Sequence, residues 1–137
     1  MVKFSFQSAF SLKDRKKLKT FLCDLILNEG YKVGLVEIIF CSDEFLLEIN
    51  RDFLKHDYYT DIITFGEATK DNTISGELYI SIDRVAENSK LYNKSINEEL
   101  HRVIFHGLLH LCGYRDKSNT EILTMRNKEE EYLSKYL

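Results

Sequence analysis

Residues 95–113 read SINEELHRVIFHGLLHLCG, and they predict one long helix at the centre of the fold. Ser95 and Glu98 form a capping-box pair at its start, and Gly113 suits the left-handed position that closes a helix. Between these ends the apolar residues fall nearly all round the helix, so we expect it to be buried on most sides. The polar stripe that remains consists of Glu99, Arg102, His106 and His110.

Strand and helix patterns alternate along the rest of the chain. Alternating or β-branched apolar runs predict four strands, at residues 2–7, 33–40, 62–65 and 74–82. Residues 66–73 are polar and are expected to form a loop. Helical spacing and capping residues predict four more helices, at 11–30, 42–53, 83–91 and from 118 onward. This order favours an α/β (α+β) sandwich, a single domain over residues 1–137, with a small mixed sheet of about four strands packed with about five helices.

The charge composition limits how the protein could bind nucleic acid. The formal net charge is −3, so the molecule as a whole does not attract nucleic acid, and RNA or DNA binding would need a local basic patch. Such a patch is offered by the run Lys13, Arg15, Lys16, Lys17 and Lys19, although a solvated helix face is the competing interpretation.

The cysteines and the apolar runs indicate a cytoplasmic protein. Cys23, Cys41 and Cys112 form no C-x-x-C pair and are expected to be reduced thiols. The first ten residues are too short and too polar for a signal peptide. No apolar run approaches the ~18 residues of a membrane span.

The spacing H-x3-H-x5-D predicts a metal site at the end of the central helix. His106 and His110 lie one turn apart on one face, and Asp116 follows the helix stop. Two imidazoles and a carboxylate can bind a divalent ion and leave a coordination position open, as catalytic metal sites do. Glycine inside a helix costs about 1 kcal/mol relative to alanine, so Gly107 indicates the close approach of another segment or of a ligand.

Two other interpretations of the histidines exist. Buried histidines are often core residues with satisfied hydrogen bonds rather than metal ligands. The H-E-x-x-H metalloprotease helix has its general base directly after the first histidine, and that position is Gly107 in this chain. The sequence therefore argues against a protease of that kind.

Three segments resemble a known family. The run H-G-x-L-H-L-x-G-Y at residues 106–114, together with residues 49–65 and 76–80, is similar to the YbeY family of bacterial rRNA-maturation endoribonucleases. The similarity extends from about residue 45 to about residue 126. It implies a single-domain, metal-dependent hydrolase that processes the 3′ end of small-subunit rRNA and acts in ribosome quality control. It also implies one zinc ion, held by residues 106, 110 and 116.

The chain departs from the family pattern at several positions. Residue 116 is Asp where the family has a third histidine, so the expected site is His2Asp, with zinc or another divalent ion such as manganese or iron. The family's arginine falls on Leu54, its proline on Tyr59, and the aspartate of its G-D-I segment on Glu77. The candidates to take over the phosphate or RNA contacts of the arginine are Lys55, His56, Arg102 and Arg115.

The sequence thus predicts a single-strand-specific, metal-dependent endoribonuclease. His106, His110 and Asp116 are its expected metal ligands and catalytic residues, and the metal would activate water that hydrolyses a phosphodiester. The expected partners are ribosomal RNA and a ribosomal subunit, with a ribosomal protein or an assembly GTPase as further candidates, and no membrane. The alternatives are a non-catalytic ribosome-assembly factor with a structural metal and a hydrolase of another substrate. The oligomeric state does not follow from the sequence.

Overall fold

A computed structural model describes all residues from Met1 to Leu137, and their element order is βαβαββααα, as predicted. The strands are β1 (Val2–Phe6), β2 (Lys32–Cys41), β3 (Ile62–Ala68) and β4 (Thr73–Ser81). The helices are α1 (Arg15–Asn28), α2 (Asp43–Leu54), α3 (Ile82–Leu91), α4 (Ile96–Leu111) and α5 (Asn119–Tyr136). The expected α/β fold with a four-stranded mixed sheet and five helices is confirmed.

The sheet has the strand order β1-β2-β4-β3. Strands β1, β2 and β4 run parallel, and β3 pairs with β4 in the antiparallel direction at one edge. In β4, Leu78 and Ile80 face one side and are fully buried, whereas Glu77 and Tyr79 face the other. Edge strand β3 lies against α4, and this contact forms one wall of the functional site described below.

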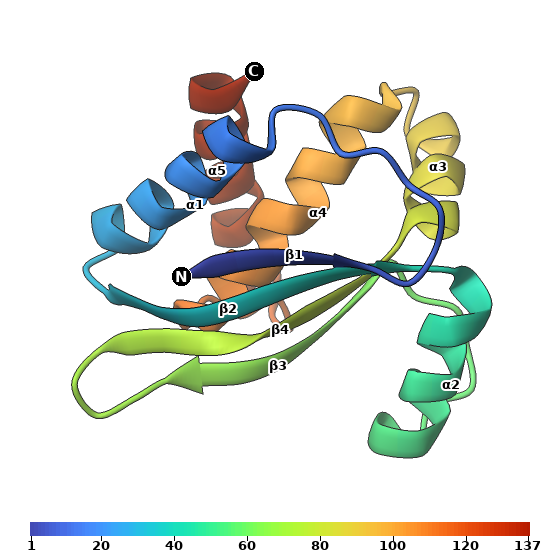
Figure 1. Cartoon of the computed structure of the whole chain (residues 1–137), viewed down its shortest axis with the longest axis horizontal. Helices are drawn as coiled ribbons and strands as arrows, with labels where there is room; N and C mark the ends of the chain where they lie inside the picture. The colour runs from blue at the N-terminus through green and yellow to red at the C-terminus, as the bar shows by residue number, and fades with distance from the viewer.

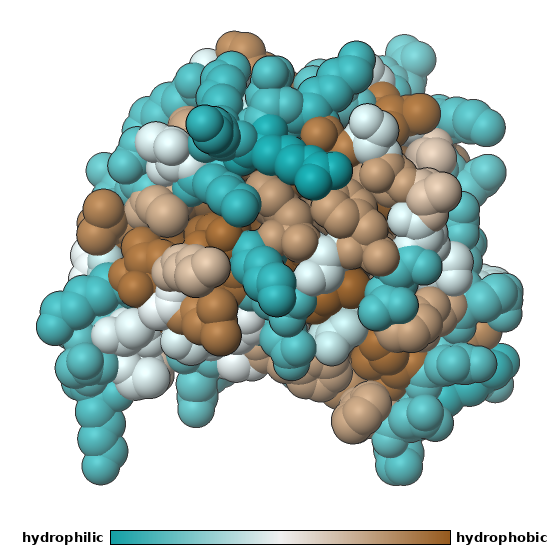
Figure 2. Space-filling model, viewed as in Figure 1, coloured by the Kyte–Doolittle hydropathy of each residue, from teal (hydrophilic) through white to brown (hydrophobic).

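Helices α1, α3, α4 and α5 lie on one face of the sheet, with α4 between the others (Figure 1). Of its 16 residues, ten are buried, which confirms the central position expected from its composition. The main core lies between these helices and the sheet. Helix α2 covers only the end of the opposite face, where Leu46 packs with Cys41 and Ile63 in a separate small cluster. In the same view, hydrophilic residues cover the helical side and the outer edges of the molecule, while apolar residues lie across the middle (Figure 2).

The expected helix caps are largely present. The side chains of Ser42, Ser95 and Ser118 each accept a hydrogen bond from the backbone N–H three residues later. Only Ser118 forms the reciprocal capping box, with Glu121, so the box expected at the start of α4 is half formed.

Three predicted boundaries were wrong. Helix α1 begins at Arg15 rather than at Ser11, because Asp14 takes the left-handed N-cap position. Helix α3 begins at Ile82, one residue before the expected start at residue 83, and its N-cap is Ser81. Strand β3 extends through Ala68, because its residues after Phe65 pair with β4, and only residues 69–72 form the turn. None of the five helices has the length and apolar composition that crossing a bilayer requires.

Candidate metal centre

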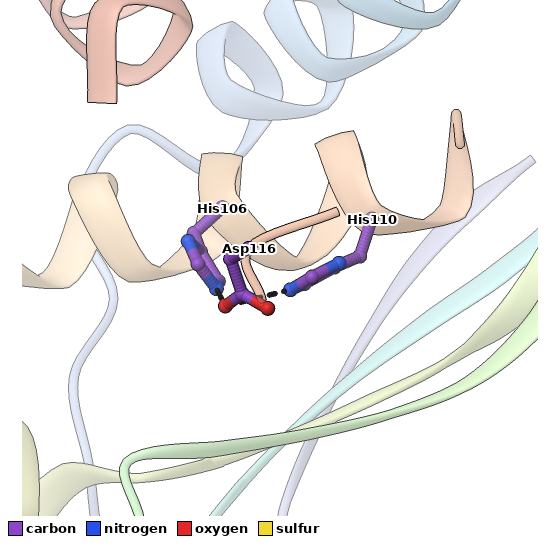
Figure 3. Close-up of side chains that lie close together, drawn as sticks. All are labelled: His106, His110 and Asp116. Carbon is purple, nitrogen blue, oxygen red and sulfur yellow. Dashed lines mark ion pairs between the residues drawn. The ribbon is translucent and has the colours of Figure 1, made fainter. Parts of the chain in front are cut away.

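Three side chains converge at the C-terminal half of α4. His106 and His110 project from the same face of the helix, with ring centroids 4.6 Å apart. The chain turns at Gly113, whose φ of +100° is the left-handed conformation that glycine adopts without strain, and returns Asp116 between the two rings (Figure 3). Asp116 Oδ2 lies 3.4 Å from His106 Nε2 and 3.3 Å from His110 Nε2.

The other ring nitrogens are held by hydrogen bonds. His106 Nδ1 donates to Glu129 Oε2 at 2.5 Å, and His110 Nδ1 donates to the carbonyl oxygen of Tyr114 at 2.8 Å. Because a carboxylate and a carbonyl only accept, each Nδ1 carries a proton, and Nε2 is the ring nitrogen that lies toward Asp116. Both imidazoles are thus oriented to bind a metal ion through Nε2.

These donors fit a divalent ion. One ligand atom from each of His106, His110 and Asp116 lies within 4.8 Å of the other two, so the group could hold a metal ion. The side chains remain partly exposed, Asp116 by 40%, which leaves access for a further ligand. Three protein ligands and an open position are typical of catalytic rather than structural sites.

Arg102 organises the carboxylates around His106. Its guanidinium donates to both oxygens of Glu99, at 2.9 and 2.7 Å, and to Glu129 at 3.2 Å, and it lies 3.6 Å from Asp61. Burial by itself lowers the pKa of Arg102, but the hydrogen bonds and charges of Glu99 and Glu129 raise it above its usual range. Burial raises the pKa of Asp61, against the opposing charge of Arg102.

A second buried carboxylate fixes the loop that carries Asp116. Glu29, at the end of α1, accepts hydrogen bonds from the hydroxyl groups of Tyr114 and Tyr132, the first at 2.7 Å, and lies 3.4 Å from Lys128 Nζ. Burial raises the pKa of Glu29, but these donors outweigh burial and hold it below its ordinary value. Tyr114 is therefore anchored through its side chain while its carbonyl oxygen orients His110.

The three candidate metal ligands border two cavities. A cleft of about 660 Å³ lies between α4, β3 and the loop from α2 to β3, and its lining includes His106, His110 and Asp116. A smaller cavity of about 230 Å³ lies between α4 and α5 and shares His106 and Asp116 with the cleft. A bound metal ion would therefore be accessible from both sides of Asp116.

The cleft wall opposite α4 carries aromatic and polar groups. His56 and Tyr58 stack with ring centroids 5.2 Å apart and are joined by a 3.0 Å hydrogen bond. Buried Asn50 holds their loop by donating to the carbonyl oxygen of Tyr58 at 2.9 Å. Leu54 also lines the cleft and brings no charge to it.

Gly107 brings α4 close to the sheet. A methyl group at Gly107 would lie 2.5 Å from Ile62 Cδ1 and 3.1 Å from Leu78 Cδ2. The close approach of a segment, expected from the glycine, is thus that of β3 and β4.

Of the four candidates for phosphate contacts, only His56 lines the cleft. Its ring is hydrogen-bonded to Tyr58 and has no charged partner. Arg102 lines the small cavity, but all its guanidinium nitrogens face carboxylates. Lys55 lines neither cavity, and its Nζ donates to the carbonyl oxygen of Asp52. Arg115 lies on a different cavity, beside Glu121.

Other expected residues lie away from the metal ligands. Glu77, which stands at the position of the aspartate in the family's G-D-I segment, lies on the opposite face of the sheet and accepts a hydrogen bond from Tyr79. His101 is a structural residue, because it is buried and its Nδ1 donates to the carbonyl oxygen of Asn97. The basic run on α1 packs on aromatic rings through Arg15, Lys17 and Lys19, and none of its members lines either cavity.

Sequence reasoning missed the residues that hold the imidazoles and those that complete the cavities. Glu129 had a detectable signal, because it lies four residues after Met125 and four before Leu133 on the buried face of α5. A carboxylate within such an apolar stripe needs a buried partner. Lys117 and Arg126, which line the cleft and the small cavity respectively, had no comparable signal.

Comparison with known proteins agrees with this geometry. A family model described as Endoribonuclease YbeY matches residues 5–137. A protein named Endoribonuclease YbeY from Cytophaga hutchinsonii is 47% identical over 131 residues, covering 96% of this chain and 92% of the relative. A protein of the same name from Parabacteroides distasonis is 52% identical over 105 residues, covering 77% of this chain and 73% of the relative.

A solved structure has a similar fold. The solution structure of a Thermotoga maritima protein matches with a TM-score of 0.70 at 28% identity, and the match covers 99% of this chain and 89% of that one. Because the family model spans nearly the whole chain and the relatives are this similar over most of their length, the chain belongs to the YbeY endoribonuclease family.

Proposed function

We propose that this protein is a metal-dependent endoribonuclease with His106, His110 and Asp116 as its metal ligands. The observation that carries the proposal is the convergence of two Nε2 atoms and one carboxylate oxygen at the wall of an open cleft. Membership of a family whose relatives are named endoribonucleases supports RNA as the substrate. A divalent ion in such a site supplies activation of water and polarisation of a phosphodiester oxygen.

The chain's own residues orient the site. Glu129 and the carbonyl oxygen of Tyr114 keep the two Nδ1 protons in place, so both Nε2 atoms face the position of the metal. Asp116 contributes a negative charge, and Asp61 lies nearby on the cleft wall. Because burial raises its pKa, Asp61 is suited to accept and return a proton at the edge of the cleft.

We further propose zinc as the metal and single-stranded ribosomal RNA as the substrate. Nitrogen and oxygen ligands in a three-residue set with an open position suit zinc. The stacked rings of His56 and Tyr58 in an exposed cleft are suited to stack on unpaired bases. Maturation of the 3′ end of small-subunit rRNA, in contact with the ribosomal subunit, is the process that we propose for this activity.

The test combines metal content with RNA cleavage. We expect about one zinc per chain in untagged wild-type protein, loss of the metal in Asp116→Ala and His110→Ala, and loss of cleavage of a single-stranded RNA in both variants. Asp24→Ala is the matched control, because Asp24 is exposed on α1 away from the cleft. Full metal-dependent cleavage by His110→Ala would refute the assignment of the site.

One structural observation favours a second function, that of a ribosome-assembly factor with a structural metal. Carboxylates outnumber cations around the metal ligands, which disfavours the approach of RNA. Wild-type protein that retains its metal and co-sediments with ribosomal subunits, but does not cleave RNA, would support that function instead.

A further inference from the structure

The metal ligands lie in a strongly negative environment. Asp116 contacts both imidazoles, and Glu129, Glu99 and Asp61 surround the single guanidinium of Arg102. These four carboxylates exceed the one cation by three charges, which is more than the two positive charges of a divalent ion. A phosphate group that reaches the metal therefore needs positive charge from elsewhere in the chain.

Arg102 does not supply this charge. It is 27% exposed, and its Nε, Nη1 and Nη2 atoms all face carboxylates of the protein. A phosphate could take over one of these contacts only by leaving a buried carboxylate, Glu99 or Glu129, without its partner, which is costly.

Two other cations border the metal ligands and have no side-chain partner. Lys117 directly follows Asp116 and lines the cleft, and Arg126 projects from α5 and lines the small cavity. Both are exposed, and neither side chain forms a hydrogen bond or an ion pair with the protein. The two cavities meet at His106 and Asp116, so one free cation is available on each side of the metal ligands.

We propose that Lys117 and Arg126 bind RNA backbone phosphates on the two sides of the metal site. This inference rests on the proposed endoribonuclease function and identifies residues that position its substrate. Arg126 can bind a phosphate with two parallel N–H donors, whereas Lys117 acts as a point charge. A single strand that enters by the cleft would then leave across the small cavity, with one phosphate between the two cations at the metal.

Arg115 provides a matched control. It is exposed, carries the same charge and precedes Asp116 directly, but it lines a separate cavity beside Glu121 and neither of the two cavities at the metal. Neutralising Arg115 therefore changes the net charge by the same amount without removing a cation from the proposed path of the RNA.

The experiment compares Lys117→Gln, Arg126→Gln and Arg115→Gln, all loaded with zinc. Affinity for a fluorescent single-stranded 2′-O-methyl RNA of 12 nucleotides is measured by anisotropy over a range of salt concentrations, and kcat/KM is measured on the corresponding RNA. We expect Lys117→Gln and Arg126→Gln each to lower affinity about tenfold at low salt, the value of one charge-assisted contact. The slope of log K against log salt should become shallower by about 0.7 for each, the value of one single-strand phosphate contact.

The outcomes separate this inference from the proposed function. Arg115→Gln should match wild type in salt slope, and all three variants should keep wild-type zinc content. If Lys117→Gln and Arg126→Gln behave like Arg115→Gln while wild type cleaves RNA, the inference is overturned and the proposed function stands. If either variant loses zinc in proportion to its loss of binding, the residue acts through the metal site and the inference is likewise wrong. Failure of zinc-loaded wild type to bind or cleave RNA would overturn the proposed function and this inference with it.

Discussion

The hydrogen bond from His106 to Glu129 predicts a specific loss of metal affinity in Glu129→Gln. One oxygen of Glu129 accepts from His106 Nδ1 at 2.5 Å and the other accepts from Arg102 at 3.2 Å. Glutamine has only one acceptor oxygen, so either His106 or Arg102 must lose its partner. Loss of a hydrogen bond that orients a metal ligand costs about 10- to 100-fold in affinity, or about 1.4–2.7 kcal/mol.

The metal-free protein should also lose stability in this variant. Glu129 is 3% exposed, so the new amide nitrogen, which faces a donor and cannot accept from it, stays buried without a partner, at a cost of about 1–3 kcal/mol. Zinc affinity is measured by competition with a chelator, and stability is measured by urea unfolding without metal. Glu130→Gln is the control, because Glu130 is the next residue of α5 and is exposed. A folded Glu129→Gln variant that binds zinc within twofold of wild type would refute the role of this hydrogen bond.

Three further predictions concern stability. Gly107→Ala gains about 1 kcal/mol of helix propensity but loses about 1–3 kcal/mol through overpacking against Ile62, so urea unfolding should show a destabilisation of up to about 2 kcal/mol. His101 has a pKa lowered by burial from its ordinary 6.5, so the folded state resists protonation and the free energy of unfolding should fall as pH drops below 6.5. This fall, by up to about 1.4 kcal/mol per pH unit, should be absent from the pH profile of His101→Gln. Tyr114→Phe removes a hydroxyl donor to the buried Glu29 carboxylate and should cost about 1.5–3 kcal/mol at pH 7 in thermal or urea unfolding.

Each of these predictions has a control. Adding Ile62→Val removes the methyl group nearest the new Cβ, so the double variant should recover stability relative to the sum of the single changes, and no recovery would contradict the packing argument. Parallel pH profiles of wild type and His101→Gln would contradict the burial argument. Tyr92→Phe, at an exposed tyrosine, should change stability little, and an equal loss in both tyrosine variants would contradict a specific role of Glu29.

The order of the elements could be predicted from the sequence because each has a clear local signal. Ser42, Ser95 and Ser118 mark the starts of three helices, and the apolar composition of α4 predicts its central position. The end of β3 could not be predicted, because residues after Phe65 are extended only through their pairing with β4. At residues 66–68, hydrogen bonds to β4 determine the backbone conformation more strongly than the polarity of the local sequence does.

The convergence of His106, His110 and Asp116 could likewise be predicted, because the three residues lie within an eleven-residue segment, on one helix and the loop after it. The groups that orient them come from distant parts of the chain: Glu29 lies 85 residues from Tyr114, and Glu129 lies 23 residues from His106. No local pattern connects such residues, so the contacts of Arg102 with Glu129 and Asp61 could not be predicted either. Only its pairing with Glu99, three residues earlier on the same helix, follows from helical spacing. The side of the sheet on which Glu77 lies follows from strand register, which only the structure gives.

The position of α5 has a consequence for how the protein becomes active during synthesis. Chains fold from the N-terminal end as they leave the ribosome, and α5 follows α4 and Asp116 in the chain. The three metal ligands are therefore synthesised before Glu129, Lys128 and Tyr132, which complete the hydrogen bonds that orient them. A metal ion that binds only when α5 is docked shifts the equilibrium between undocked and docked α5 toward the docked state. If the proposed metal-dependent function holds, a nascent chain without a docked α5 would therefore bind metal weakly and would not cleave RNA.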